Sequence, residues 1–198
     1  MYTQTNDRLW RKNRQPRSGT SCIGTDENRN WPHKHWSDTN GASTSPCSDT
    51  YKGAGPGDTN EIKNLVAFTK NIASNNGITL FIDWHSYGQY ILIPYGYDCD
   101  LKAANHNVQL TLAKNTAQAL FNSGGSRFIT GQSCETLYAT TGDSTDYMMD
   151  EAGAEFAWTI ELRPEDTGGS SGFILPASQI LPAGVEQWDA MKYLIASV

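Results

Sequence analysis

A single glutamate closes an apolar run late in the sequence. The segment FAWTI, residues 156–160, has the composition of a buried strand, and Glu161 follows it directly. Burial at the end of such a strand raises the pKa of a carboxyl group unless a cation or a metal-bound water compensates. A carboxylate with a raised pKa suits general-base catalysis. The alternative role for Glu161 is an ion pair with Arg163 or another arginine.

The histidines are the next side chains that could bind a metal or move a proton. His85 ends the apolar strand FIDWH beside a predicted loop, which suits a metal ligand or an acid–base group. The alternative for His85 is a hydrogen-bonded imidazole in the core. His33 and His35 form an H-x-H pair that could hold a metal, although a solvated loop is the favoured interpretation. His106 is expected to be exposed on a helix.

Arginines gather in the first part of the chain. Arg8, Arg11 and Arg14 recur every third residue in DRLWRKNR, and Arg29 lies between asparagines in ENRNW. A guanidinium group presents a planar fork that binds a carboxylate through two hydrogen bonds. Arginines placed in this way in an acidic protein indicate an anionic ligand. The alternative is a solvated basic turn, which we favour for Arg14 and Arg17.

Tyr138 lies in LYATTGDSTDY, a stretch rich in Gly and Thr. A phenol in such a stretch could move over a cleft and contact a ligand there. The alternative is a loop tyrosine that packs on its neighbours.

Helical and strand patterns alternate along the chain. Apolar positions at helical spacing follow Thr59, a suitable N-cap, and Asn76-Gly77 ends that pattern. Residues 15–60 show little periodicity, which in a compact domain is typical of a functional segment. The alternation predicts an α/β layered domain. The predicted helices are 59–75, 101–123, 144–152 (capped by Ser144) and 177–196 (kinked near Pro182), and the predicted strands are 78–88, 90–96 and 156–162.

The composition excludes several classes of protein. The 198 residues carry a formal net charge of −6, so no basic surface for nucleic acid is evident. No run of about 18 apolar residues occurs, so no membrane-spanning helix is expected. The opening segment MYTQ has neither the basic head nor the apolar core of a secretory signal. The length fits one domain or part of a larger one.

The four cysteines, Cys22, Cys47, Cys99 and Cys134, contain no CxxC pair, so a zinc knuckle is not expected. They allow three disulfide pairings, and four buried thiols are the alternative. Gly, Ser, Thr and Asn are abundant, and Trp and Tyr are plentiful. This composition is typical of an extracellular protein and favours disulfides.

Seven segments occur in an order that resembles a known enzyme family. They are DRLWRKNR, DENRNW, SPCSDTYKG, DWHSYGQ with IPYGY, LYATTGDSTDY, IELR and GFILPASQI. Together they closely resemble the zinc metallocarboxypeptidases of the pancreatic carboxypeptidase A/B type, from residue 1 to residue 198. One such segment would be weak evidence, whereas seven in register are specific. The resemblance implies an α/β fold with a mixed, largely parallel sheet and helices on both faces.

The resemblance assigns chemical roles to three residues. His85 matches the family's third zinc ligand, and Glu161 matches the general base that takes a proton from zinc-bound water. Arg11 matches the residue that polarises the scissile carbonyl and stabilises the developing oxyanion. These roles agree with the chemistry of peptide hydrolysis, which needs a strong nucleophile at neutral pH.

Other positions match the family's substrate-binding residues. Asn28 and Arg29 match the clamp on the substrate's terminal carboxylate, and Tyr138 matches the phenol that closes over it. Arg8 matches a secondary position along the substrate path, and Tyr87 belongs to the same substrate-binding set. The resemblance therefore implies a ligand with a free C-terminus.

The pocket for the terminal side chain resembles segment 133–146. Its deep position aligns with Thr145, which implies an apolar or undemanding pocket. Asp143 could also admit basic side chains, or it could point to solvent. The resemblance further implies two disulfides, Cys22–Cys47, common in the family, and Cys99–Cys134, found in some members.

One part of the family's zinc site has no match in this sequence. The first two zinc ligands of the family lie in an HxxE motif upstream of the position of Arg8, and no HxxE occurs here. The segment HWSD at 35–38 has the wrong acid and the wrong place. A catalytic zinc ordinarily needs three protein ligands plus water. We therefore expect residues 1–198 to be a single partial catalytic domain that lacks N-terminal strands and two zinc ligands and is inactive alone.

The expected function is hydrolysis of the C-terminal peptide bond of peptides and proteins, with one Zn²⁺ ion as cofactor and two of its three protein ligands upstream. The expected setting is a secreted monomer whose partners are peptide C-termini, with no nucleic acid and no membrane. The alternative is a non-catalytic protein that binds peptide C-termini through Asn28, Arg29 and Tyr138 without a metal.

Overall fold

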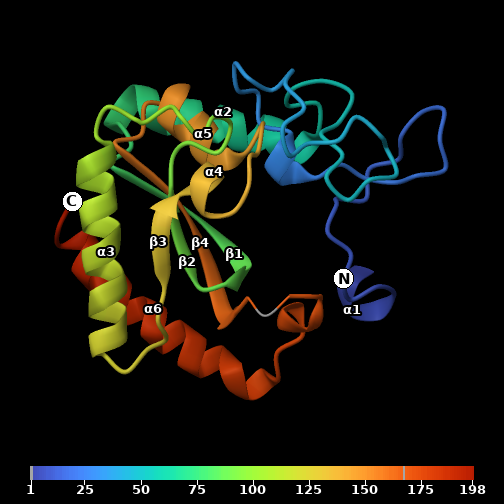
Figure 1. Ribbon diagram of the computed structural model, residues 1–198. Coiled ribbons are helices and arrows are strands. Elements are labelled where there is room, and N and C mark those ends of the chain that lie inside the picture. Colours follow the sequence, from blue (N-terminus) through green and yellow to red (C-terminus); the bar gives the residue numbers. More distant parts are fainter. Residues whose placement is uncertain (1, 167) are drawn as a thin grey trace.

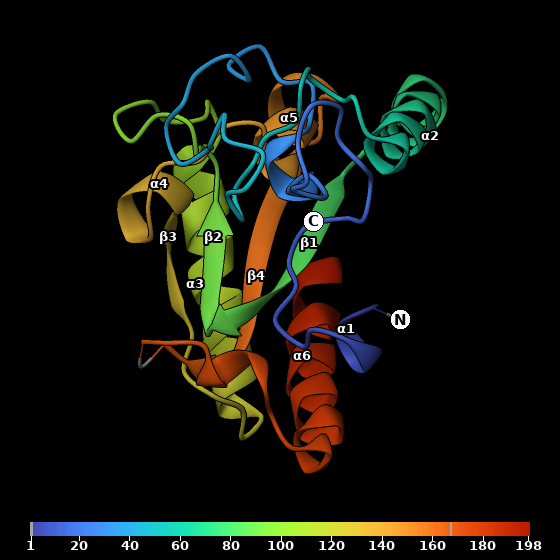
Figure 2. The same ribbon diagram turned by 90° about the vertical axis from the view of Figure 1, so that its right-hand side faces the viewer.

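The computed structural model describes residues 2–166 and 168–198. Its central element is a sheet of four strands: β1 (Leu80–Gly88), β2 (Tyr90–Ile93), β3 (Ile129–Gln132) and β4 (Phe156–Glu165). The strands lie in the order β1-β4-β2-β3, which Figure 2 shows from right to left. β1 pairs with β4, and β2 with β3, in parallel, whereas β2 and β4 are antiparallel. The predicted mixed α/β sheet is confirmed.

Helices α3 (His106–Asn122) and α6 (Ile180–Ile195) cover one face of the sheet (Figure 1). Phe156, Trp158 and Ile160 of β4 are buried in the core that this face forms with aliphatic residues of both helices. Because side chains alternate along a strand, Thr159 and Glu161 point to the opposite face. Within the described residues no helix has the length and apolar character to cross a membrane.

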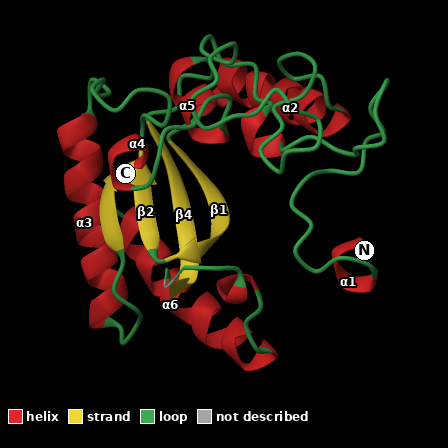
Figure 3. Ribbon diagram, turned by 45° about the vertical axis from the view of Figure 1, so that its right-hand side comes forward, coloured by secondary structure: helices red, strands yellow, loops and turns green. Residues whose placement is uncertain are grey.

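The opposite face is covered by α2 (Asn60–Asn76) and α5 (Ser144–Asp150). Ile62, Tyr147 and Met148 from these helices pack with Trp31 and Ala157 in a second apolar cluster. Residues 6–59, which have little regular structure, lie on the same side as α2 and α5 (Figure 3). The remaining short elements are α1 (Tyr2–Thr5), η1 (Glu27–Arg29), α4 (Ser133–Thr136), η2 (Ser171–Phe173) and η3 (Ala177–Gln179).

The predicted helices form, but several of their ends differ from the prediction. The hydroxyl of Thr59 accepts a hydrogen bond from Ile62 N and caps α2, as predicted. Helix α3 begins at His106 rather than at residue 101, and His106 is half-buried in its first turn rather than exposed. The carboxylate of Asp143, not Ser144, caps α5. Helix α6 is continuous from Ile180, so residues 177–179 form a separate turn.

Two predicted features near the sheet also change. The run 90–96 is a strand only as far as Ile93. Strand β3 and helix α4, which follow one another without a break, were not predicted. Pro182 lies in the first turn of α6, where a missing N–H has no helical partner to lose, so no kink is required there.

The irregular segment 6–59 is held by long-range polar contacts. Arg17 forms an ion pair with Asp58 at 2.6 Å and lies over the ring of Tyr51, so it is not the solvated residue predicted from the sequence. The ammonium group of buried Lys52 donates to three backbone carbonyls between residues 36 and 38. The disulfide Cys22–Cys47 closes this segment, which confirms that pairing.

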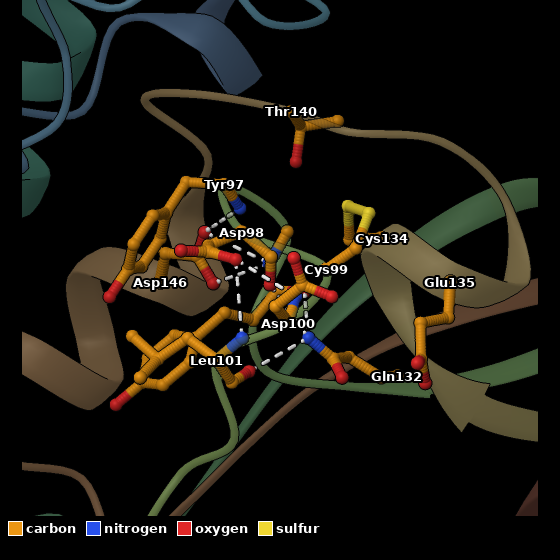
Figure 4. Close-up of a disulfide and its surroundings, with 12 residues drawn as sticks. Tyr97, Asp98, Cys99, Asp100, Leu101, Gln132, Cys134, Glu135, Thr140 and Asp146 are labelled. Carbon is orange, nitrogen blue, oxygen red and sulfur yellow. Dashed lines mark hydrogen bonds between the residues drawn. A yellow bond between two sulfur atoms is a disulfide. The ribbon is translucent and has the colours of Figure 1, made fainter.

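The second predicted disulfide, Cys99–Cys134, ties the loop after β2 to α4 and is confirmed (Figure 4). Next to it, Gln132 Nε2 donates to the carbonyls of Asp98 (2.8 Å) and Leu101 (3.0 Å), as Figure 4 shows. This buried amide and the disulfide together fix the junction of β3 and α4. The residues that follow this junction line the cavity described below.

Candidate active site

A cavity of about 340 Å³ opens at the carboxyl ends of β1 and β4. The two strands are parallel neighbours, and His85 is directly opposite Glu161 in their register. Ligand sites in open α/β sheets commonly lie at the carboxyl ends of the strands. The polar and aromatic lining includes Arg11, Asn28, Arg29, His85, Tyr87, Tyr138, Asp143, Thr145, Glu161 and Phe173. The structure thus brings nearly all the predicted site residues together.

Glu161 presents an unpaired oxygen inside this cavity. Its Oε2 atom is buried and has no hydrogen-bond partner among the described residues. Arg163 does not pair with it, because the Arg163 guanidinium instead binds Glu186 at 2.5 Å. Burial raises the pKa of the Glu161 carboxyl above its ordinary value, although the positive charges of His85 and Arg11 oppose that rise. The group can therefore hold or release a proton at a defined position.

His85 is held through one of its two ring nitrogens. Its Nε2 atom lies 2.9 Å from Asp83 Oδ2 and 3.2 Å from Asn28 Nδ2, whereas Nδ1 has no hydrogen-bond partner among the described residues. Burial lowers the pKa of His85, but the hydrogen bond and charge of Asp83 outweigh burial and raise it overall. The Nδ1 atom is the one through which His85 could bind a ligand or a metal.

Arg29 is a buried cation that forms no ion pair with any described residue. The residue is 3% exposed, its Nε donates to Gly41 O at 2.8 Å, and its Nη1 donates to Asn28 O at 2.7 Å. Among the described residues no carboxylate lies within ion-pair distance of it. A buried charge without a partner is costly, so this guanidinium fits an anionic ligand.

Asp26 orients two other polar groups of the cavity. Its Oδ2 accepts from Arg11 Nε at 2.9 Å, and its Oδ1 accepts from Asn28 N at 3.1 Å. Tyr138 is 56% exposed at the rim, which leaves its phenol free of the core. Arg8 lies outside the cavity lining, where it donates to the carbonyl of Phe173 at 2.8 Å.

An aromatic wall closes one side of the cavity. Tyr87 packs edge-on against Phe173, with ring centroids 4.9 Å apart, and its hydroxyl donates to Gly169 O at 2.5 Å. Gly172 lies against the Tyr87 ring, where an added Cβ would come within 2.4 Å of ring carbons. Glycine at this position therefore permits the close packing of the wall.

Thr145 and Asp143 line the cavity at the start of α5. Asp143 is buried, and its Oδ1 accepts from Thr145 Oγ1 (3.0 Å) and Asp146 N (2.9 Å). Its Oδ2 accepts from Thr140 Oγ1 at 2.6 Å. Both oxygens are therefore engaged, although the residue still lines the cavity.

The other histidines lie away from this cavity. His33 is buried rather than solvated, because its Nε2 contacts Asp150 Oδ2 at 3.2 Å and its ring packs on Tyr97. His35 stacks on the same tyrosine at 4.3 Å and contacts Asp38. The H-x-H pair thus has a packing role in the structure.

The described residues do not contain a complete metal site. They hold no group of three or more His, Cys, Asp or Glu side chains arranged to bind a metal ion. Two groups nevertheless fit parts of one: the free Nδ1 of His85 fits a single ligand, and the unpaired Oε2 of Glu161 fits a nearby base. The donor set of this chain therefore fits part of a zinc site and not the whole.

Comparison with known families agrees with this arrangement. A family model described as zinc carboxypeptidase matches residues 1–190. The chain belongs to the zinc carboxypeptidase family. The resemblance predicted from the seven sequence segments is confirmed.

Curated relatives of the family match over most or all of this chain. Metallocarboxypeptidase A of Trichophyton rubrum is 48% identical over 185 residues, which cover 93% of this chain and 43% of the relative. Carboxypeptidase A4 of Mus musculus is 40% identical over 198 residues, which cover all of this chain and 45% of the relative. The chain thus spans less than half the length of these relatives.

Solved structures of the family share the fold. Bovine thrombin-activatable fibrinolysis inhibitor, in complex with tick carboxypeptidase inhibitor, superposes with a TM-score of 0.90 at 35% identity. That match covers 99% of this chain and 64% of the other. Carboxypeptidase A from Helicoverpa armigera gives a TM-score of 0.85 at 31% identity, covering 98% of this chain and 47% of the other.

Three residues at the site of this zinc carboxypeptidase chain were not identified from the sequence. Asp26, Asp83 and Ser144 each contact a predicted site residue. The D-x-H spacing of Asp83 and His85 was a usable signal, because residues two apart on a strand point to the same face. Asp26 is also marked locally, because its side chain accepts from the N–H of Asn28 two residues later. No local signal marks Ser144, whose contacts with Asn28 and Asp83 are distant in the sequence.

Proposed function

We propose that this chain carries the substrate clamp and the general base of a zinc carboxypeptidase that hydrolyses the C-terminal peptide bond of peptides and proteins. In this proposal residues 1–198 form one partial catalytic domain, and the zinc ligands other than His85 lie outside these residues. The observation that carries the proposal is the buried, unpaired Arg29 guanidinium in the same cavity as the unpaired Oε2 of Glu161.

The clamp explains a preference for the last residue of a peptide. Arg29, with the amide of Asn28 beside it, would bind the terminal carboxylate, and Tyr138 at the rim would close over it. An internal peptide bond would leave the Arg29 cation buried and unpaired, at a cost of about 3–5 kcal/mol. Recognition of the free carboxylate therefore restricts cleavage to the chain end.

The chemical step needs a base and a group that stabilises negative charge. A zinc ion, when bound, lowers the pKa of its water ligand to about 7. Glu161 Oε2 would accept a proton and then pass it to the leaving amine, as its burial and lack of a partner allow. Arg11, held by Asp26 at the edge of the cavity, would face the developing oxyanion.

Preference for the terminal side chain depends on the cavity lining at the start of α5. Thr145 offers a small side chain, which suits an apolar or undemanding pocket. Asp143 would favour basic side chains through its charge, even though hydroxyl and amide groups already occupy its oxygens. Two disulfides support an extracellular setting, and the proposed state of the full-length gene product is a monomer.

The test is made on the full-length gene product. We expect about one zinc per chain by elemental analysis, together with release of C-terminal residues from free peptides and none from amidated ones. Glu161→Gln should abolish turnover while peptide binding is retained, because the substitution removes the base but keeps the size of the side chain. Full activity of Glu161→Gln would refute the assigned role.

A second candidate function is a non-catalytic protein that binds peptide C-termini. It is favoured by one observation: Arg29 and Asn28 line the cavity, while the described residues gather no three-ligand metal group. Zinc-free protein that binds free-carboxylate peptides but not amidated ones, and releases no amino acid, would support this candidate. Stoichiometric zinc with turnover would exclude it.

A further inference from the structure

Asp83 and His85 are paired on the same face of β1. They are two residues apart on the strand, and Asp83 Oδ2 lies 2.9 Å from His85 Nε2. An ionised carboxylate can only accept hydrogen bonds. The imidazole nitrogen at this distance must therefore carry a proton, because two lone pairs would otherwise face each other.

Asn28 Nδ2, which can only donate, also lies 3.2 Å from His85 Nε2, and it could donate there only if that nitrogen carried no proton. The contact with the ionised Asp83 is shorter, at 2.9 Å, and a charge-assisted hydrogen bond is about twice as strong as a neutral one, so Asp83 decides where the proton lies. Asn28 Oδ1 is turned away, because that atom accepts from Ser144 N at 2.9 Å. Asp83 is thus the acceptor at Nε2, and the lone pair of His85 lies on Nδ1.

Ser144 connects these groups. Its hydroxyl donates to Asp83 Oδ2, and its backbone N–H donates to Asn28 Oδ1. The residue is 2% exposed at the first position of α5, so packing fixes it. His85, Asp83, Ser144 and Asn28 thereby form a closed ring of contacts between the imidazole and the predicted carboxylate clamp.

We propose that Asp83, supported by Ser144, is the positioning residue that fixes His85 in its Nε2–H tautomer and so presents Nδ1 to the cavity. Carboxylates that accept from the second nitrogen of a metal-binding histidine orient the ring and raise its basicity as a ligand. The tautomer follows from the contacts of this chain alone. Its use for metal binding rests on the proposed function.

The first experiment measures the tautomer directly and needs no metal. The 198-residue chain is labelled with ¹⁵N, and its four imidazoles are examined by NMR at a pH where they are neutral, with His85→Gln to assign the signals. We expect His85 to be in the Nε2–H form. A dominant Nδ1–H form would overturn the proposal. If the chain gives a poorly dispersed spectrum, the same measurement is made on the full-length gene product.

The second experiment compares variants of the positioning pair. Asp83→Ala should produce a mixture of tautomers, Ser144→Ala a smaller change, and Asp83→Asn should retain part of the preference through its remaining acceptor oxygen. Asp38→Ala is the matched control. Asp38 Oδ2 lies 3.1 Å from His35 Nδ1, and neither residue lines the cavity. An unchanged His85 tautomer in Asp83→Ala, in a protein with native circular dichroism, would refute the positioning role.

A measurement of zinc affinity distinguishes failure of the Asp83 proposal from failure of the proposed function. In the full-length gene product, competition with a chelating dye should show about 10- to 100-fold weaker zinc binding for Asp83→Ala and no change for Asp38→Ala. Equal affinity in the Asp83→Ala variant would overturn the link to the metal. Absence of zinc binding in the parent protein would instead refute the proposed function, while the tautomer measurement would still decide the role of Asp83.

Discussion

At the scale of single residues, the cavity is defined by two groups whose charges are not paired within the part of the chain that the structure describes. There, Arg29 is a buried cation without an ion pair, and Glu161 carries a buried oxygen without a donor. Burying such groups without a partner is unfavourable, because each unsatisfied buried donor or acceptor costs about 1–3 kcal/mol of stability. Both are therefore best explained by a ligand that supplies the missing partner, and the two lie in one cavity.

Arg29→Ala should weaken binding of peptides with a free C-terminus far more than binding of amidated peptides. Hydrogen bonds to charged groups are worth about 1.5–3 kcal/mol, so the expected loss is about 10- to 100-fold. Titration calorimetry in a Glu161→Gln background measures affinity without turnover. Arg127→Ala is the control, because Arg127 is exposed, stacks on the ring of Phe121 and does not line the cavity. Equal losses for the two kinds of peptide would contradict the clamp.

The Arg163–Glu186 ion pair should make the free energy of unfolding fall at acid pH. Burial raises the pKa of the Glu186 carboxyl, but the hydrogen bond from Arg163 outweighs burial and lowers it below the ordinary 4.5. A carboxyl whose pKa is depressed by folding stabilises the protein above its unfolded pKa, and that contribution is lost as pH falls through the folded value. Urea unfolding at decreasing pH measures this loss.

Glu186→Gln supplies the comparison for the acid dependence of unfolding. The variant keeps an acceptor for Arg163 but has no ionisable group, so its free energy of unfolding should be lower at neutral pH by about 1–3 kcal/mol. The difference between variant and parent should shrink at acid pH. A constant difference across the whole range would show that the ion pair contributes no pH dependence.

At the scale of elements, helix α5 (Ser144–Asp150) connects the cavity to the rest of the fold. Its first residues supply Ser144 and Thr145, and its last residue, Asp150, accepts from Tyr95 Oη at 2.7 Å and contacts Lys34 Nζ at 2.8 Å. Between these ends, Asp146 accepts from the backbone N–H groups of residues 96 and 97. The helix therefore links Asn28, through Ser144, to the loop that follows β2.

The N-cap of α5 should be measurable as a stability difference. Asp143→Ala removes the carboxylate that accepts from Asp146 N and should lower the free energy of unfolding by about 1 kcal/mol. Asp143→Asn is the matched control, because asparagine caps helices about as well as aspartate. Thermal unfolding of the two variants compares them. Equal destabilisation would mean that the charge of Asp143, and not its capping bond, is what stabilises the helix.

Element prediction succeeded where the signal was local. Thr59, the apolar spacing that follows it and Gly77 mark α2 without any tertiary information. Strand β3 was missed because it has only four residues, one of them Gly131. Its partner strand is also distant in the sequence, since Ile129 pairs with Tyr90, 39 positions earlier. The cap of α5 was misplaced by one residue, since Asp143 and Ser144 are both good capping residues.

Sequence motifs predicted which residues belong to the candidate site, but not which residues contact one another there. Resemblance supplied His85, Glu161 and Arg29, and the cavity contains all three. It gave no indication that Arg17 pairs with Asp58, 41 residues away, which leaves the Arg17 side chain 9% exposed. Nor did it indicate that Asp83 holds His85, because that role depends on which ring nitrogen the fold turns toward the carboxylate.

At the scale of the whole molecule, the described residues leave unusual apolar surfaces uncovered. On α2, Leu65 is 47% and Phe68 62% exposed. On α6, Leu181, Val185 and Trp188 follow helical spacing and are 74%, 51% and 63% exposed. Strand β1 lies at the edge of the sheet, with β4 as its only strand partner among the described residues. Contiguous apolar surface and an open strand edge both favour association with another polypeptide.

The isolated 198-residue chain should therefore self-associate. Sedimentation at increasing concentration should give a mass that rises above the 21.8 kDa of one chain. Phe68→Glu and Trp188→Glu, each made alone, should shift the distribution toward the monomer, because each introduces one charge into one of the two apolar surfaces. Val108→Glu is the matched control, since Val108 is 58% exposed on α3, away from both surfaces. A parent chain that stays monomeric at every concentration would show that these surfaces do not drive association, and an equal effect of the control substitution would attribute the change to net charge alone.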